Sequence, residues 1–452
     1  MPSAAIEGAD ALKFQRWITA QQYPADCGTT VGILTRAGMQ PDGRTHYPGD
    51  YFYGLGLGSQ MAALKFNLVH ALLRGRVYHF PTTHYVNPVR CPLQTFDCYF
   101  APPTNCSRYK PGEEALTTAA AAATATATAA ATNGIAVSPP AVSARATHLS
   151  IETAPLLWCF ELPRKRLSRL AGLRGVHAEA WYHGQLAAFL FRPNAQMSAF
   201  RASLLPEFAY DLNHTRAAAL SRQPGGLHNG TCAAMHVRRT DKFRGRRRED
   251  MRAQIGFTGF GRAFKFWAHW MSTRPATQVR VLLGSEDPAT FRAMPPLVAP
   301  TVGYWIPSRH FVMSSFKDIT DNNNKLVDKY ASLLKRMAEA RATGPAAVAA
   351  LEAAGALKDE GMALVVQILL MSECEALFGS FASNVAILVH DLMHARMVSR
   401  GERLHAVDVN GRTYCGCGAS FCMKLERRAT REPRRTVRNM VEAFRGHNIN
   451  AI

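Results

Sequence analysis

Short apolar runs alternate with longer helical stretches along most of this chain. Three runs read as buried strands, at residues 76–80, 231–237 and 278–284. Helical patterns occupy residues 61–73, 178–191, 257–272 and 325–342. Strands that alternate with helices build parallel sheets whose faces the helices cover. We therefore predict an α/β fold with an open, mainly parallel sheet in each half of the chain.

The length of 452 residues allows two domains, each with its own core. Residues 115–147 are mostly Ala, Thr, Ser and Pro, a composition that buries little apolar surface. We expect this segment to be a flexible insert in the first domain. The predicted order is an N-terminal extension at 1–50, a first α/β domain at 51–230, a second at 231–400 and a basic tail at 401–452.

The chain is strongly basic, with 53 Lys and Arg against 33 Asp and Glu and a formal net charge of +20. Such a surplus favours polyanionic partners: nucleic acid, anionic membranes or phosphorylated small molecules. Basic runs at 164–166, 246–248 and 427–438 keep a nucleic-acid-binding protein as an alternative. However, no known nucleic-acid module is visible, and the aromatic residues are not interleaved with these runs. We expect no nucleic-acid partner.

Ten cysteines are more than a reduced cytosolic enzyme usually needs. Neither of their two clusters offers a fourth ligand at zinc-site spacing, so we expect disulfides formed in an oxidising compartment. The clusters are Cys91, Cys98 and Cys106, and Cys415, Cys417 and Cys422. Residues 1–30 contain no apolar run as long as a signal peptide or membrane anchor.

A cluster of charged residues follows the apolar run 231–237. Residues 236–242 read His-Val-Arg-Arg-Thr-Asp-Lys, which puts Arg238 and Arg239 where a parallel strand should end. Ligands of open α/β sheets bind beyond the carboxyl ends of the strands. Two adjacent guanidinium groups there can hold a diphosphate by bidentate hydrogen bonds, and Asp241 can orient one of them. The alternative is an exposed charged turn without a ligand.

The same string resembles the donor-binding motif of the α-1,6-fucosyltransferases, both those that modify the N-glycan core and the bacterial chitin-oligosaccharide enzymes. Further segments match that family's pattern in the same order. They are Gly-Leu-Gly-Leu-Gly-Ser-Gln at 54–60, Trp-Tyr-His-Gly-Gln at 181–185, Gly-Ser-Glu-Asp-Pro at 284–288, and Met-Ser at 371–372 with Phe-Ala-Ser-Asn at 381–384. The resemblance spans residues 54–393 and implies two Rossmann-like, GT-B-like domains that transfer L-fucose from GDP-fucose.

The resemblance also implies which residues bind the donor. Arg238 corresponds to the arginine that contacts the pyrophosphate, and His236 to a side chain that lines the nucleotide pocket. Arg239, Asp241 and Lys242 are expected to organise the same site, with Lys242 and Arg238 also serving catalysis.

Two further segments are expected to approach the pyrophosphate. Ser383 corresponds to a hydroxyl that binds it; the alternative is a helix N-cap, which is compatible with phosphate binding at a helix start. Gly56 and Gly58 lie in the glycine-rich turn, where the backbone can come close to the donor. The alternative there is a purely structural turn, because the Lys-Ser/Thr of a phosphate-binding Walker loop is missing.

Carboxylates are implied for the acceptor side and for proton transfer. Glu286 and Asp287 match an acidic pair near the acceptor sugar, with a strand-to-helix cap as the alternative. An insertion after the motif brings Asp250, or its neighbour Glu249, to the place of the family's carboxylate. This group would take the proton of the acceptor hydroxyl in a single displacement with inversion.

The sequence departs from the family's pattern at the guanine site, where Gln367 replaces an aspartate. A carboxylate accepts hydrogen bonds from both guanine N1–H and N2–H, whereas an amide accepts only one of them. Because of Gln367, an inactive fucosyltransferase-like protein is a further alternative. We also expect the small barrel that ends the animal enzymes to be missing, because residues 401–452 are too short and too charged to build it.

The resemblance also implies the donor and the acceptor of the reaction. The implied donor is GDP-fucose, and the acceptor is a glycan or glycoprotein, by family default the N-glycan core GlcNAc in an α-1,6 linkage. No Asp-x-Asp motif occurs in the chain, so we expect no metal and no other cofactor. The expected disulfides favour the Golgi lumen as the location, although no membrane anchor is visible in this sequence.

Overall fold

Two parallel sheets organise the fold. The computed structural model describes residues 4–27, 31–36, 57–79, 96–106, 150–155, 162–203, 232–238, 257–272, 280–285, 287–298, 304–305, 324–353, 360–381, 383–402, 404–409, 414 and 416. Within both sheets every strand pair is parallel. This confirms the predicted α/β class and the parallel sheet in each half. The two-domain arrangement remains a prediction, and the 115–147 insert lies outside the described residues.

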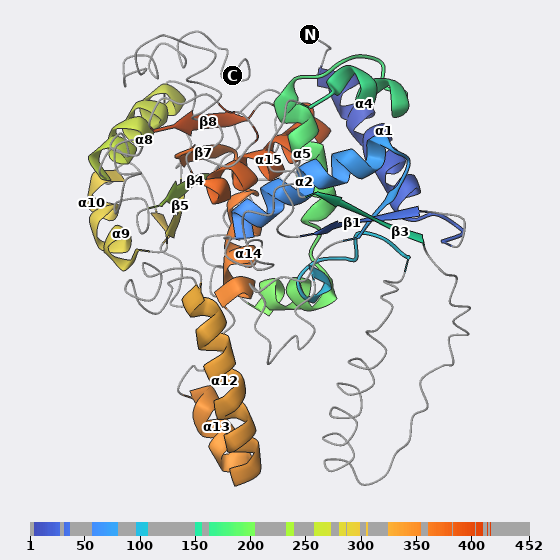
Figure 1. Cartoon of the computed structure of the whole chain (residues 1–452). Helices are drawn as coiled ribbons and strands as arrows, with labels where there is room; N and C mark the ends of the chain where they lie inside the picture. Colours follow the sequence, from blue (N-terminus) through green and yellow to red (C-terminus); the bar gives the residue numbers. More distant parts are fainter. Residues whose placement is uncertain are drawn as a thin grey trace.

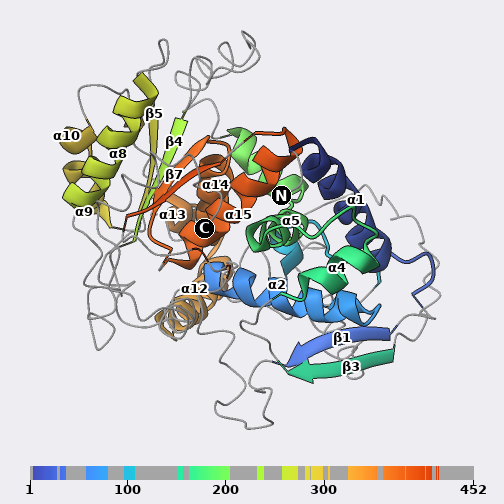
Figure 2. The same ribbon diagram turned by 90° about the horizontal axis from the view of Figure 1, so that it is seen from above.

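The smaller sheet has three strands in the order β2-β1-β3. They are β1 (Val31–Arg36), β2 (Val77–His79) and β3 (Ser150–Pro155). The helices of this half include α1 (Ala4–Gln22), α2 (Leu57–Leu73), α4 (Arg164–Leu170) and α5 (Glu179–Leu190), with a 3₁₀ turn η1 at Phe96–Cys98. In Figure 2, α2 lies between β1 and β3 on one side and α5 on the other.

The larger sheet has five strands in the order β6-β5-β4-β7-β8. They are β4 (Cys232–Val237), β5 (Arg280–Ser285), β6 (Tyr304–Trp305), β7 (Ala376–Gly379) and β8 (His405–Asp408). On one side of this sheet lie α8 (Phe257–Ser272), α9 (Pro288–Ala293) and α10 (Pro295–Val298). On the other side lie α14 (Glu360–Met371) and α15 (Asn384–Ser399) (Figure 1).

The main hydrophobic core joins the two halves of the chain. Helix α15 belongs to the second half by sequence, yet it packs against α5, α1 and α2 of the first half. Phe66, Trp181, Leu377 and Val389 all belong to this one cluster of buried side chains. A second cluster lies between the five-stranded sheet and α8, where Phe264 and Trp267 pack against Phe378 of β7.

A helical hairpin projects from the body (Figure 1). It consists of α12 (Asn324–Thr343) and α13 (Pro345–Ala353), joined through Gly344, whose φ of 127° lies in the region that favours glycine. Leu333, Met337 and Ala340 are buried at helical spacing on α12. The side chains of α13 include none that is fully buried.

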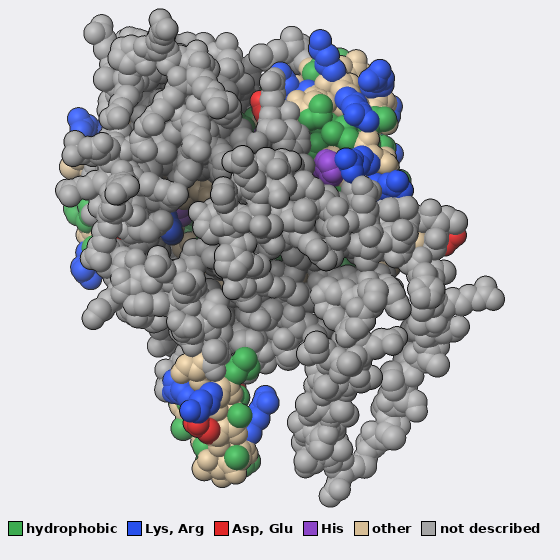
Figure 3. Space-filling model, in the orientation of Figure 1, with side chains coloured by type: hydrophobic (Ala, Val, Ile, Leu, Met, Phe, Trp, Pro, Cys, Tyr) green, Lys and Arg blue, Asp and Glu red, His purple; other side chains and the backbone are tan. Residues whose placement is uncertain are grey.

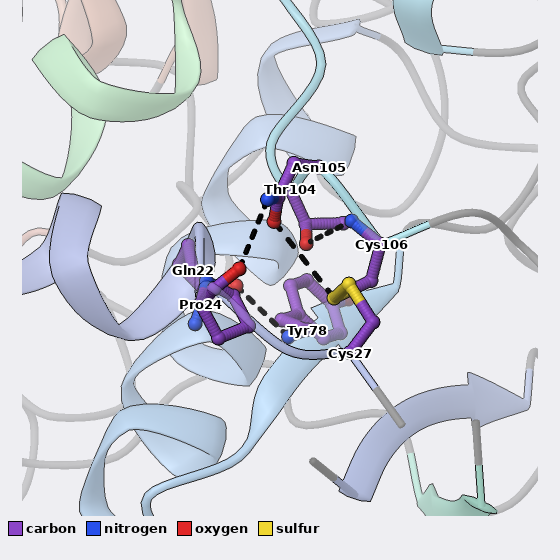
Figure 4. The surroundings of a disulfide bond; sticks show 7 residues. All are labelled: Gln22, Pro24, Cys27, Tyr78, Thr104, Asn105 and Cys106. Carbon is purple, nitrogen blue, oxygen red and sulfur yellow. Dashed lines mark hydrogen bonds between the residues drawn. A yellow bond between two sulfur atoms is a disulfide. The ribbon is translucent and has the colours of Figure 1, made fainter. Parts of the chain in front are cut away.

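A disulfide ties the chain after α1 to the chain after η1. Cys27 and Cys106 are bonded, with a Cα–Cα distance of 5.5 Å (Figure 4). Beside them, the Asn105 side chain donates to the Pro24 carbonyl at 3.0 Å. Cys98 and Cys374 are disulfide-bonded as well, and no cysteine side chain in the described part is a free thiol. Disulfides are thus confirmed for Cys98 and Cys106, while Cys91, Cys415, Cys417 and Cys422 lie outside the described residues.

The sequence left two parts of this architecture unassigned. Residues 1–50 were expected to be an extension, yet α1 buries Ala11, Phe14 and Ile18 at helical spacing in the main core. Residues 405–408, within the predicted basic tail, form edge strand β8. Among the described helices, none combines the length and the apolar character that a membrane crossing requires.

Candidate functional site

The carboxyl ends of β4, β5 and β7 meet along one edge of the larger sheet. His236 lies near the end of β4 and is buried, and Arg238 follows the strand as a half-buried side chain. In the sheet register His236 pairs with Gly284 and Val237 with Ser285. The motif predicted to bind a ligand therefore begins at the edge where open parallel sheets bind ligands.

The end of β5 is fixed by hydrogen bonds that continue into α9. The Ser285 hydroxyl donates to the Val237 carbonyl at 2.7 Å, which joins β5 to the last residue of β4. Asp287 is the N-cap of α9, and its carboxylate accepts a hydrogen bond from the Ala289 amide at 2.9 Å. This is the capping role that the sequence offered as the alternative for Asp287. Its contact with an acceptor sugar remains a prediction.

Gln367 of α14 lies against the sheet beside Gly284, near the end of β5. Its side chain is 5% exposed, and its Nε2 atom has no hydrogen-bond partner. A Cβ atom at Gly284 would lie 3.1 Å from the Gln367 Cδ, so glycine at 284 makes room for this amide. Register partners on neighbouring strands point to the same face of a sheet, so His236 faces the side that α14 covers. The predicted base-reading residue and the predicted nucleotide-pocket residue are thus neighbours.

Ser383 is the N-cap of α15, the helix that follows β7. Its backbone is extended, with φ −100° and ψ 122°, and its side chain is buried. The hydroxyl makes no capping hydrogen bond, although capping is the usual role of serine at this position. The first turn of α15 therefore receives no side-chain acceptor from its own cap residue.

The first turns of α2 and α15 are in direct contact. A Cβ atom at Gly58 would lie 2.7 Å from the carbonyl carbon of Asn384 and 2.8 Å from the Val385 amide nitrogen. Real Cβ contacts are never this close, so only glycine permits the approach. The Asn384 side chain also donates to the Ser59 hydroxyl. Gly58 is therefore placed at the candidate site, in contact with the helix that Ser383 begins.

The two helices remain in contact two turns further along. Lys65 Nζ bonds to Asp391 Oδ2, and both side chains are buried. Lys65 is seven residues after Gly58, and Asp391 is seven residues after Asn384, so both contacts lie on one face of each helix. The helices consequently run parallel, and their positive dipole ends meet at the same point. Two such ends in contact favour an anion between or beside them.

A buried polar network surrounds this ion pair. The Tyr414 hydroxyl donates to Asp391 Oδ1, and Lys65 Nζ donates to the Gly416 carbonyl at 3.3 Å. Burial raises the pKa of Asp391, but the Lys65 charge and a hydrogen bond from His390 outweigh it and hold that pKa well below its usual range. Burial and the Asp391 charge raise the pKa of Tyr414 well above its ordinary value. The network thus holds an ionised carboxylate and a neutral phenol.

The structure places some predicted site residues and leaves others outside the described part. His236, Arg238, Asp287, Gln367, Ser383 and Gly58 are described. Seven lie outside the described residues: Arg239, Asp241, Lys242, Glu249, Asp250, Glu286 and Gly56. Among the described residues, no three His, Cys, Asp or Glu side chains are grouped as metal ligands would be.

Sequence reasoning missed the residues that join α2 to α15. Asp391 is the single charged residue in the apolar run 385–393, and Lys65 lies within the apolar helix 57–73. A lone charge inside an apolar helix requires a partner, because burying an unpaired charge is very costly. That signal could have identified both residues as paired, but it does not reveal that they pair with each other.

Comparisons with known proteins give no assignment. No family model matches the chain, and no curated protein matches it. A solved structure that it resembles is NodZ alpha-1,6-fucosyltransferase soaked with GDP-fucose, at 12% sequence identity and a TM-score of 0.33. The match covers 80% of this chain and 92% of that one. A likeness this distant carries no argument about fold or activity.

Proposed function

We propose that this chain is a glycosyltransferase that binds a nucleoside-diphosphate sugar at the carboxyl edge of the larger sheet. The observation that carries the proposal is the contact between the first turns of α2 and α15, at Gly58 and Asn384. Both helix dipoles place partial positive charge at that point, and the Ser383 hydroxyl is not used as a cap. A pyrophosphate supplies the charge and the acceptors that these groups lack.

Arg238 supports the same assignment from the neighbouring strand. It follows β4, and β4 pairs directly with β7, the strand that precedes α15. Neighbouring strands are roughly 5 Å apart, so the Arg238 side chain is within reach of a ligand at the start of α15. A guanidinium group binds phosphate through two parallel hydrogen bonds, which a lysine cannot reproduce.

The nucleobase would lie against α14. Gln367 is buried with an unpartnered Nε2, a state that costs free energy unless a ligand satisfies it. Guanine can accept from this atom at O6 while its N1–H donates to the Gln367 Oε1. His236, on the same face of the sheet, would form part of the same pocket.

The full proposal follows the resemblance of the motifs: L-fucose is transferred from GDP-fucose to a glycan, with the α-1,6 position of the N-glycan core GlcNAc as the acceptor. The acceptor oxygen attacks the anomeric carbon, the bond from that carbon to the β-phosphate oxygen breaks, and configuration inverts. Asp250 or Glu249 takes the acceptor proton. Arg238, Lys242 and the start of α15 stabilise the negative charge on the departing GDP.

A donor screen tests the proposal. GDP-fucose, GDP-mannose and UDP-sugars are compared for hydrolysis, for transfer, and for protection against thermal unfolding. The matched variants are Arg238→Lys and Arg262→Lys, the latter being an exposed arginine on α8. Arg238→Lys should lose ~2–4 kcal/mol of transition-state stabilisation, or roughly 30- to 1000-fold in kcat/KM, whereas Arg262→Lys should be unchanged.

Two results would overturn the assignment. If Arg238→Lys transfers fucose at the wild-type rate, Arg238 does not clamp the pyrophosphate. If no nucleoside-diphosphate sugar protects the wild-type protein or is turned over, the site does not serve a glycosyltransferase.

A further inference from the structure

The outer face formed by α1 and α4 is densely basic. On α1, Lys13 and Arg16 point outward at helical spacing. On α4 and the loop behind it, four further cations are exposed: Lys165, Arg166, Arg169 and Arg174. We call this surface, made by residues 12–16 and 165–176, the α1–α4 face.

No carboxylate on the described segments of this face balances these cations. Helices α1 and α4 and the loop 171–178 contain only two acidic residues, Glu7 and Asp10, and neither is exposed. Asp10 points inward, where its Oδ2 lies 2.8 Å from His177 Nε2 and accepts from the Arg174 amide at 3.1 Å. The ion pairs found in the described part of the chain include none of the six exposed cations. The positive charge of this face is therefore directed at solvent.

Apolar side chains lie within the same face. Leu12 is 55% exposed, Leu170 44% and Val176 46%, and they are three of the four large exposed hydrophobic residues in the described part. The hydrogen bonds from Lys13 Nζ to the Gly172 carbonyl and from the Arg174 amide to Asp10 join the two segments into one surface. Figure 3 shows hydrophobic side chains surrounded by Lys and Arg side chains over α1 and α4.

We infer that the α1–α4 face docks on an anionic lipid bilayer. Lysine and arginine bind anionic headgroups, while aliphatic side chains on the same face enter the boundary with the acyl chains. A nucleic acid would use the cations but not the aliphatic residues, because base stacking requires exposed aromatic rings. The exposed large hydrophobics of this face are all aliphatic. This inference does not rest on the proposed transferase activity.

Vesicle co-sedimentation of the full chain tests the inference. Phosphatidylcholine vesicles with and without phosphatidylglycerol are compared, and binding is expected only when phosphatidylglycerol is present. The triple variant Lys165→Gln/Arg169→Gln/Arg174→Gln should bind roughly 100-fold more weakly, since each cation near an anionic surface contributes about fivefold. The control Lys335→Gln/Arg336→Gln/Arg341→Gln removes the same charge from exposed positions on α12 and should bind within roughly twofold of wild type.

A second variant separates a bilayer from other polyanions. Leu12→Ser/Leu170→Ser keeps every cation but should lower vesicle binding roughly tenfold, because it removes the inserting side chains. The same proteins are titrated with duplex DNA, and thermal melting confirms that each variant is folded. The inference is overturned if wild type binds both vesicle types equally, or if the α12 control loses as much binding as the Lys165/Arg169/Arg174 triple variant. It is also overturned if DNA binds as tightly as the vesicles and the leucine variant behaves as wild type.

Discussion

The buried ion pair between Lys65 and Asp391 offers a quantitative test of how α2 and α15 are held together. Lys65→Met keeps the length and most of the volume of the side chain but removes the ammonium group. Asp391 then loses the cation that keeps it ionised, and the Tyr414 hydroxyl and the flanking His390 remain beside its carboxylate. Asp391→Leu leaves the opposite defect, a buried ammonium group whose other partner is the Gly416 carbonyl.

Each single variant should lose about 3–5 kcal/mol of unfolding free energy, the cost of leaving one buried charge unpaired. For a domain of this kind that corresponds to a fall in Tm of roughly 6–20 °C. The double variant Lys65→Met/Asp391→Leu removes both charges, so it should lie within about 1–2 kcal/mol of wild type. The coupling free energy between the two positions should then exceed about 3 kcal/mol.

Equilibrium unfolding in urea measures these free energies, and GDP titration adds a functional readout. Because the pair sets the register that brings Gly58 to Asn384, the single variants should also weaken GDP binding while they remain folded. Asp10→Asn is the control, since it disrupts a different buried contact, to His177, outside the α2–α15 interface. Additive effects of Lys65→Met and Asp391→Leu would refute the pairing. Equal loss of GDP affinity in Asp10→Asn would refute the positioning argument.

Three further outcomes are expected. Gly58→Ala should lower the unfolding free energy by about 1–3 kcal/mol and reduce GDP affinity, because its Cβ would lie 2.7 Å from the Asn384 carbonyl carbon and force the first turns of α2 and α15 apart. A melting temperature equal to that of wild type would contradict this. Gln367→Asp should raise the preference for GDP over inosine diphosphate, because a carboxylate accepts both N1–H and N2–H of guanine and inosine lacks the 2-amino group. An unchanged ratio of the two affinities in calorimetry would exclude Gln367 from the base site. Burial lowers the pKa of His394 from 6.5 to about 4, so the unfolded chain takes up a proton first as pH falls. Stability should drop by up to roughly 3 kcal/mol between those pH values, and His394→Phe should remove that component from unfolding curves measured across the window.

The sequence predicted the elements whose pattern is local. The helix expected at 257–272 is α8 with the same bounds, and the strand expected at 231–237 is β4. Both have a clear apolar period and end at charge or polar residues. Helix α1 was missed because its buried residues Ala11, Phe14 and Ile18 are spaced among polar residues, which gives a weak apolar face.

Contacts between residues far apart in the chain could not be predicted from the sequence. Nothing local indicates that Cys27 pairs with Cys106 across 79 residues, or that Gly58 contacts Asn384. The glycine-rich turn and the start of α15 were each predicted to approach the donor, but only the fold shows that they touch. The carboxylate at Asp250 or Glu249 lies outside the described residues, so its role remains a prediction.

We propose that the meeting point of α2 and α15 binds the pyrophosphate of a nucleotide. Calorimetric titration with GDP and with guanosine tests it most directly, because the two ligands differ only in the diphosphate. We expect one GDP to bind per chain and guanosine to bind at least roughly 100-fold more weakly, since charge-assisted hydrogen bonds contribute about 1.5–3 kcal/mol each. Equal affinity for GDP and guanosine, or no heat with either, would contradict it.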